Sequence, residues 1–403
     1  MNQFQLSHLN IPKPTIAQFS HVHDIHIKIY LMFSELIDKT PDGQKVLQAL
    51  SADTRVQGLV NTMISKGSSA ARFEIKDLAM WFLWASNEFG PKSAEKNLNL
   101  FLDSAEIEVI CTLWVLGIET TTTLDLGEGY QIVPVSEMPL SSDSEYYMQH
   151  ERYRSGRMDA KPKAALTKIV KIRKTWTDEP LPDAEPKTEF WLAHQRLSEL
   201  ALLLNAISGV SCVAFYQTAY FQKDMPMGTF GGSGGGAPIH DIYGLGSTPI
   251  TQGLTSEIGK LHQSFQKLNK KEKQRVSMAL SRLSQAKRRF NIPDKILDLC
   301  IALEMLLLAD NKSHEQLALS FRLRGSWLIA TNHDERKNVY GLLKSIYTFR
   351  SQVAHSGALK READIKHIRE FFPEYAGITE RIIQTCILTP TPDWTNIILG
   401  IAL

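Results

Sequence analysis

The stretch "DKILDLCIALEMLLLAD", residues 294–310, is the part of the sequence that says most about the fold. Its apolar residues fall on nearly every side of a helix, which predicts a helix enclosed by other helices. Pro293 and Asp294 are typical of a first helical turn and indicate where this helix begins. The neighbouring segments read as amphipathic helices with short loops, including a last helix interrupted or kinked near Pro373. We therefore predict an antiparallel helical bundle over residues 257–390.

Capping signals predict where the helices on the C-terminal side begin and end. Ser313 and Gln316, three residues apart, form a capping box before an amphipathic stretch. Asn332 and Glu335 repeat that spacing and predict the start of the next helix. Gly357 occupies the glycine position that commonly follows a helix C-terminus, so this second helix should end just before it.

The chain before the bundle mixes helical and extended patterns, so the fold class is α+β overall, with a mixed α/β N-terminal region over residues 1–175. Within it, β-branched residues around a glycine-containing turn predict a hairpin at 120–135. Residues 175–190 are rich in proline and acid, as linkers are. A connecting segment, 187–250, should hold a helix and then a strand. Its glycine-rich stretch 226–249 predicts loop throughout, and no Gly-Lys-Ser/Thr follows to make a phosphate cradle.

The composition is that of an ordinary soluble protein, with 43% hydrophobic residues, 22% charged residues and a net charge of +2. Any binding of nucleic acid must therefore be local. No signal peptide is visible, and the uncharged stretch 201–221, although long enough to span a bilayer, contains polar residues that favour a buried helix followed by a strand. The widely spaced cysteines predict buried free thiols in a reducing cytosol: Cys111, Cys212, Cys300 and Cys386. We expect a cytoplasmic protein.

One arginine and one histidine near the C-terminus stand out from the helical pattern. On a helical wheel, Arg350 lies at the buried edge of the apolar stripe, within about 60° of Leu343, Ile346, Val353 and Ala354. Glu304 lies in the equally apolar stretch 294–310, so we expect the two charges to face each other across adjacent helices. His355 falls about 140° from Arg350, in the last turn, and should be exposed. The alternative is a register-fixing salt bridge and a histidine favoured by the helix dipole.

Residues 294–358 resemble the C-terminal helical domain of the Apea-like HEPN family. The stretches that carry the resemblance are "LCIALEMLLL", "LALSFRLRGSWLIA" and "VYGLLKSIYTFRSQVAHSG". The last contains Arg350 and His355 in the spacing Arg-x4-His, the short form of the Arg-x4-6-His motif of HEPN ribonucleases. The motif lies at the C-terminal end of a predicted bundle helix, and the preceding apolar helix contains Glu304. The resemblance implies an all-α, HEPN-like antiparallel bundle.

The resemblance further implies a metal-independent endoribonuclease that acts as a homodimer and needs no cofactor. His355 would serve as general base or acid, Arg350 would hold the scissile phosphate, and Glu304 and Ser351 would support them. Attack by the 2′-hydroxyl of the RNA substrate would leave a 2′,3′-cyclic phosphate and a 5′-hydroxyl. A role as a toxin in bacterial antiphage defence, by abortive infection, is also implied. The N-terminal region would then be a sensor or restraint, responding to a phage-derived or nucleotide trigger.

Two positions depart from the family pattern. Many active members have Asn, Asp or His directly after the arginine, where this chain has Ser351. The toxin subgroup that a partner nucleotidyltransferase modifies has a tyrosine two residues after the histidine, where this chain has Gly357, so that regulation is not implied. Ser351 keeps open an alternative of a different class, in which the bundle is a non-catalytic HEPN module that binds RNA or nucleotide and mediates dimerisation.

Two other groups of residues are candidates for a site. "HVHDIHIK" could supply metal ligands for a metal enzyme, but its order does not match the metallo-hydrolase pattern, and a surface or core role is favoured for His21, His23, Asp24 and His26. The basic helix predicted over 260–289 could be a solvated face or a local RNA-binding patch. Its cations include Arg275, Arg282 and Lys287, and the RNA-binding candidates are Lys270, Lys271, Lys273, Arg288 and Arg289.

Overall fold

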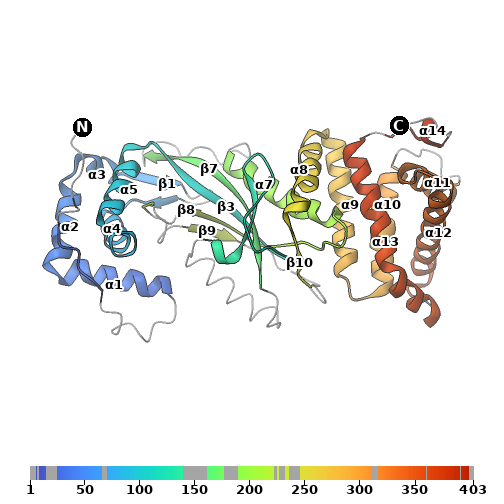
Figure 1. Ribbon diagram of the computed structural model, residues 1–403, viewed down its shortest axis with the longest axis horizontal. Coiled ribbons are helices and arrows are strands. Elements are labelled where there is room, and N and C mark those ends of the chain that lie inside the picture. The colour runs from blue at the N-terminus through green and yellow to red at the C-terminus, as the bar shows by residue number, and fades with distance from the viewer. Residues whose placement is uncertain are drawn as a thin grey trace.

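A computed structural model describes residues 6, 9–14, 25–65, 70–138, 161–176, 189–221, 225–226, 232–235, 246–309, 316–359, 361–390 and 392–398. Three parts follow one another along the long axis of the molecule: a group of N-terminal helices, a largely antiparallel sheet, and a helical bundle (Figure 1). The α+β fold class predicted from the sequence is therefore confirmed. Among the helices of the described ranges, none is both long and apolar enough to cross a membrane.

The N-terminal helices pack around one buried helix, α4, whose central residues Leu78 to Ser86 are all buried. Side chains cap two of the shorter helices, because Thr40 accepts a hydrogen bond from the Gly43 amide and Asp53 accepts one from the Arg55 amide. The elements of this part are α1 (Ile25–Lys39), α2 (Pro41–Ala52), α3 (Thr54–Leu59), β1 (Thr62–Ser65), β2 (Ala70–Arg72), α4 (Ile75–Phe89) and α5 (Pro91–Asp103).

The sheet has the strand order β2-β1-β7-β3-β8-β9, with β6 (Tyr130–Pro134) pairing on β7 and β5 (Leu124–Asp125) on β6. Its long inner strands are β3 (Glu106–Leu116), β7 (Ala164–Trp176) and β8 (Val213–Phe221). Alternate residues of β3 point to opposite faces, as a strand requires, so that Val109 joins the main core and Trp114 a second, smaller core. Helix α7 (Glu189–Leu203) packs against all three inner strands.

Two local predictions for this region are confirmed. The hairpin at 120–135 exists as β5 and β6, joined by a turn in which Gly127 and Gly129 have positive φ, and the short helix η2 (Val135–Glu137) follows it. The uncharged stretch 201–221 runs from the end of α7 through the short helix η3 (Leu204–Ala206) into β8. Within the predicted linker 175–190, residues 177–188 lie outside the described part of the chain.

The connecting segment differs from its prediction in two respects. Strand β8 lies between β3 and β9 in the sheet, so residues 187–250 contribute an inner strand and do not merely join two regions. The glycine-rich stretch is not loop throughout, because β9 (Gly232–Gly235) pairs antiparallel with β8. That prediction was wrong for these residues, since a strand at the edge of a sheet is held by backbone hydrogen bonds that glycine can make. A separate parallel pair joins β4 (Ile118–Glu119) and β10 (Thr248–Pro249).

The bundle is built around α10 (Ile292–Leu307), which packs against α9, α11, α12 and α13. Its central position is the one that its apolar sequence predicts. The basic stretch before it forms two helices, because the chain turns at Leu268 and Asn269, and the Asn269 side chain caps the second. The other helices are α8 (Gln252–Lys267), α9 (Lys270–Arg288), α11 (Leu317–Ile329), α12 (His333–Ser356), α13 (Glu362–Leu388) and α14 (Trp394–Ile398).

Two predicted details of these helices concern the start of α11 and the proline inside α13. Helix α11 begins after Gln316, which has a left-handed backbone and no side-chain cap, while Ser313 of the predicted capping box lies outside the described residues. Helix α13 continues through Pro373 without interruption.

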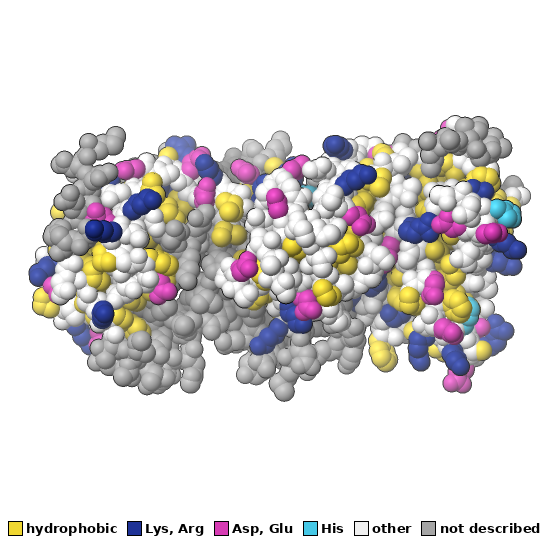
Figure 2. Space-filling view, in the orientation of Figure 1, with side chains coloured by type: hydrophobic (Ala, Val, Ile, Leu, Met, Phe, Trp, Pro, Cys, Tyr) yellow, Lys and Arg dark blue, Asp and Glu magenta, His cyan; other side chains and the backbone are white. Residues whose placement is uncertain are grey.

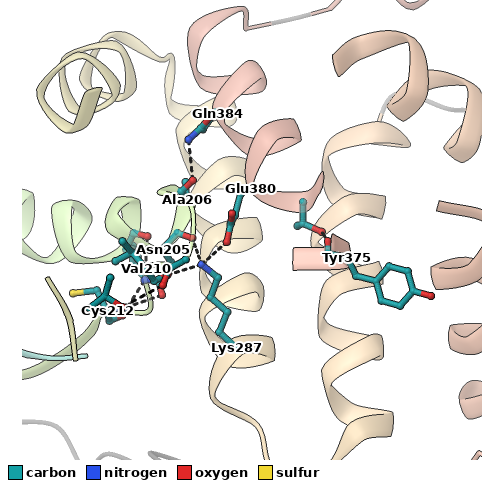
Figure 3. A network of polar contacts seen from close by, with 12 residues as sticks. Asn205, Ala206, Val210, Cys212, Lys287, Tyr375, Glu380 and Gln384 are labelled. Atoms are coloured by element: carbon teal, nitrogen blue, oxygen red, sulfur yellow. Dashed lines mark hydrogen bonds and ion pairs between the residues drawn. The ribbon is translucent and has the colours of Figure 1, made fainter. Parts of the chain in front are cut away.

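A buried lysine joins two helices of the bundle to the segment that leads into β8 (Figure 3). The Lys287 ammonium of α9 lies 2.7 Å from Glu380 Oε1 of α13 and donates hydrogen bonds to the carbonyl oxygens of Asn205 and Val210, at 2.6 and 2.5 Å. The two charged side chains are only 8% and 6% exposed. Because Asn205 and Val210 precede β8, one lysine joins two bundle helices to the sheet region.

Candidate functional site

Helix α12 has the boundaries that its capping residues predict. At its N-terminus the Asn332 side chain accepts a hydrogen bond from the Glu335 amide at 2.9 Å, and the Glu335 carboxylate accepts one from the Thr331 amide at 2.9 Å. At its C-terminus Gly357 has φ 72° and donates to the Val353 carbonyl at 2.8 Å. Both ends are thus fixed locally, and they set the position of the last turn that carries His355.

The two charges expected to face each other do so. Arg350 Nε lies 3.5 Å from Glu304 Oε1, and Arg350 Nη2 lies 3.5 Å from Glu304 Oε2, across α12 and α10. The side chains are 34% and 24% exposed, so the pair lies at the edge of the bundle and not inside it. The apolar stripe is correspondingly narrower than the wheel suggests, since Ala354 is exposed. The pairing was therefore predicted correctly and its depth was overestimated.

His355 is exposed, as expected, and lines a groove between the C-terminal half of α12 and the start of α13. The groove has a volume of about 650 Å³ and is lined by Tyr347, Thr348, Ser351, Gln352, His355, Ser356, Arg361 and Asp364. This size lies within the range of small-ligand sites. The side chains of Ser351, Gln352 and His355 make no hydrogen bond or ion pair with any other residue that the structure describes. Three adjacent polar groups are thus available to a ligand.

On the side of α13, the groove is bordered by an ion pair between Arg361 and Asp364. Arg361 donates to both carboxylate oxygens of Asp364, at 2.9 Å each, and Asp364 is buried while Arg361 is exposed. Neither residue was predicted from the sequence, because both come from the start of the next helix and share no motif with α12. Tyr347 and Gln352 were missed too, although Tyr347 precedes Ser351 by four residues and His355 by eight, a same-face spacing that is visible in the sequence.

Arg350 does not line the groove. Tyr347 connects the groove with the Arg350–Glu304 ion pair. Its side chain forms part of the groove wall, and its pKa depends on the charges of that pair. Burial raises the pKa of Tyr347 from its ordinary value, the Glu304 carboxylate adds to the rise, and the Arg350 guanidinium opposes it. The structure thus brings His355 and Ser351 together, brings Arg350 and Glu304 together, and connects the two pairs through Tyr347.

Several of the candidate RNA-binding cations form ion pairs with carboxylates of the protein itself. Lys273 Nζ lies 2.9 Å from Glu199 Oε2 of α7. Arg289 Nε lies 3.1 Å from one oxygen of the buried Asp298, whose other oxygen is 2.9 Å from Arg282. Lys273 thus joins α9 to α7, and Arg282 and Arg289 join the end of α9 to α10 within the bundle. The clustering of these cations in the sequence does not by itself make an RNA-binding surface.

The remaining candidates do not form one patch. Lys270 and Lys271 are exposed at the N-terminal end of α9, whereas Arg288 is at the opposite end, about 27 Å along the helix. Basic and acidic side chains are interspersed over the face of the described molecule shown in Figure 2, without a continuous basic surface. Among the sequence candidates, Lys270 and Lys271 remain the exposed cations that could contact RNA.

The histidine-rich stretch near the N-terminus is mostly outside the described residues. His21, His23 and Asp24 fall there, and His26 belongs to α1, where its side chain is not described. Elsewhere, within the described ranges, no three His, Cys, Asp or Glu side chains come together as metal ligands would. All four cysteines are buried free thiols, as predicted.

No protein-family model, curated protein or solved structure matches this chain. The resemblance of residues 294–358 to the HEPN family therefore remains a hypothesis that rests on the sequence, and the functions it implies are proposals.

Proposed function

We propose that this chain is a metal-independent endoribonuclease of the HEPN type, with His355 and Arg350 as its catalytic residues. The observation that carries the proposal is the groove at the C-terminal end of α12, where an exposed histidine lies beside Ser351 and Gln352. The side chains of these two residues make no hydrogen bond to another described residue. Arg350 is near the groove but outside it, one-third exposed and held at 3.5 Å by Glu304. An arginine so loosely paired can turn toward a phosphate.

The reaction needs proton transfers and stabilisation of charge on phosphorus. The 2′-hydroxyl oxygen attacks the adjacent phosphorus, its proton passes to a general base, and the bond from phosphorus to the 5′-oxygen breaks. The leaving 5′-oxygen takes a proton from a general acid, which gives a 2′,3′-cyclic phosphate and a 5′-hydroxyl. A histidine side chain can act as either the base or the acid, and this is the role that we assign to His355. Arg350 would neutralise the charge on the phosphate oxygens with its bidentate fork.

One histidine supplies one acid/base group, and the reaction uses two. A two-fold dimer that brings His355 near its symmetry mate would provide the second group. The exposed position of His355 at the end of α12 suits such an arrangement. We expect light scattering to give a dimer at micromolar concentration, and a strict monomer with full activity would contradict this arrangement.

The activity is tested by incubating purified protein with total RNA in EDTA and analysing the new ends. We expect 2′,3′-cyclic phosphates, and His355→Ala should lower the rate by about 10²–10⁴-fold. His333→Ala is the matched control, because His333 is exposed on the same helix about 33 Å away and should not affect the rate. Arg350→Lys keeps the charge but loses the fork, so its rate should fall too. Cleavage at the wild-type rate by His355→Ala would refute the catalytic assignment.

A non-catalytic module that binds RNA or nucleotide and mediates dimerisation is the second candidate. It is favoured by one observation, which is that Arg350 is engaged by Glu304 and does not line the groove. The same experiment separates the two functions, because the module would bind RNA without producing new ends in any buffer.

A role in antiphage defence follows from the HEPN resemblance and would make the N-terminal helices and sheet a sensor or restraint. Inducible expression in a bacterial host tests it. The wild-type chain should protect cells from phage, and His355→Ala should abolish the protection at an equal protein level.

A further inference from the structure

A substrate that touches both candidate catalytic residues must cross the surface between them. On α12, Tyr347, Ser351 and His355 lie about 60°, 100° and 140° around the helix from Arg350, all in the same direction. Tyr347 and Ser351 therefore lie in the angular gap between Arg350 and His355. Both also line the groove.

Among the described residues that line this groove, Tyr347 is the one with a large aromatic ring of the Phe, Tyr or Trp type. Its ring packs on the ring of Phe321, a fully buried residue of α11, with centroids 5.3 Å apart and an angle of 55° between the planes. Tyr347 itself is half-buried, so one part of the ring is fixed in the core while another borders the groove. A ring held in this way loses little conformational freedom when a ligand stacks on it.

We infer that Tyr347 is a stacking platform for an unpaired base of the RNA, which makes single-stranded RNA the substrate class. The inference rests on the proposed function, because it places the base beside the histidine that would act on the neighbouring 2′-hydroxyl. Ser351 and Gln352 line the same groove, and their side chains can hydrogen-bond to the base or sugar because neither has a partner within the described residues.

The chemistry of the groove favours an unpaired nucleotide over a duplex. Bases in a double helix are stacked on one another and are not offered to a protein ring, whereas bases in single strands and loops can be. The side chains that line the groove are mostly neutral, and its one cation, Arg361, is paired with Asp364. A surface of this kind suits a base and sugar better than the closely spaced phosphates of a duplex.

Binding is measured apart from cleavage by using an oligonucleotide that cannot be cut. The assay is fluorescence anisotropy of a 2′-O-methyl RNA strand titrated with the full chain. A strand of about ten nucleotides covers a normal single-strand site. We expect Tyr347→Leu, which retains an apolar contact with Phe321, to raise the Kd at least about fivefold. Tyr347→Phe keeps the ring and should stay within about twofold.

Tyr340→Ala is the matched control. Tyr340 lies two turns earlier on the same side of α12 but does not line the groove. The Arg322 guanidinium carbon lies over the Tyr340 ring, 5.2 Å from the ring centroid. The Kd of Tyr340→Ala should match that of the wild type. A thermal melt of each variant shows whether the fold is retained. Wild-type binding by Tyr347→Leu, or equally tight binding of the blunt duplex of the same strand, would overturn the inference.

Failure of the inference and failure of the proposed function give different results. If single strands bind in a Tyr347-dependent way but RNA with free 2′-hydroxyls is never cut, the endoribonuclease proposal fails and the platform stands. If RNA is cut in a His355-dependent way while Tyr347→Leu binds and cuts like the wild type, the platform is wrong and the catalytic proposal stands.

Discussion

Replacing Lys287 with methionine should destabilise the protein strongly, because it removes the cation that holds the bundle to the sheet (Figure 3). Three groups lose their partner: the Glu380 carboxylate, which is 6% exposed, and the carbonyl oxygens of Asn205 and Val210. A buried charge left without its partner costs about 3–5 kcal/mol. Each unsatisfied buried carbonyl adds about 1–3 kcal/mol where water cannot reach it.

Equilibrium unfolding in urea measures the loss, and Lys271→Met is the control because Lys271 is an exposed lysine of the same helix. We expect at least about 3 kcal/mol for Lys287→Met and less than about 0.5 kcal/mol for the control. Adding Glu380→Leu to Lys287→Met should recover part of the loss but not all, because the two carbonyls remain unpaired. A loss below about 1 kcal/mol for Lys287→Met would show that this contact does not hold the parts together.

The pH dependence of that variant supplies a second, independent check. Burial already raises the pKa of Glu380 in the wild type, while Lys287 opposes the rise. Without Lys287 the pKa of Glu380 should rise further in the folded state. A carboxyl group whose pKa is raised in the folded state destabilises the fold above that pKa. The penalty disappears as the pH falls toward the pKa that the group has in the unfolded chain. The difference between Lys287→Met and the wild type should therefore shrink on acidification.

The remaining predictions concern groups with different degrees of burial. Glu304→Ala should cost about 1 kcal/mol in a thermal melt, and not the 3–5 kcal/mol of a buried pair, since Glu304 and Arg350 are partly exposed and 3.5 Å apart. Burial lowers the pKa of His194 to about 4, so stability should fall as pH drops from about 6.5 to 4, by up to about 3 kcal/mol. His194→Phe should lack this part of the pH dependence, and identical pH profiles of unfolding would contradict the assignment.

Features encoded by neighbouring residues were predictable from the sequence. The ends of α12 follow from Asn332, Glu335 and Gly357, which act within one turn of the helix they cap. The hairpin β5–β6 follows from its own turn, and the central position of α10 follows from apolar residues on every side. In each case the deciding contacts lie close in the chain, or the pattern of the segment itself reports its environment.

Features that depend on distant partners were not predictable. Strand β9 is made of glycine and serine, and only the neighbouring β8 makes it a strand. The cations of α9 look like one basic surface in the sequence, but Lys273 and Lys287 pair with Glu199 and Glu380, which come from other elements. The groove likewise needs α13 as its second wall. A helical wheel gives the direction of a side chain but not the depth of its helix in the bundle, which is why Arg350 is less buried than expected.

The cations of α9 are paired within the protein, whereas polar side chains of the groove are not. This contrast is the strongest structural reason to place a functional site at the end of α12. The cations Lys273, Lys287 and Arg289 each lie within 3.1 Å of a carboxylate on another element, so each charge is paired within the folded protein. In the groove, Ser351 and Gln352 are half-buried, and their side chains make no hydrogen bond or ion pair within the described chain. Half-buried polar side chains of this kind are free to hydrogen-bond to water or to a ligand. A ligand with its own donors and acceptors would satisfy them, and an RNA nucleotide has both beside the 2′-hydroxyl that His355 would deprotonate.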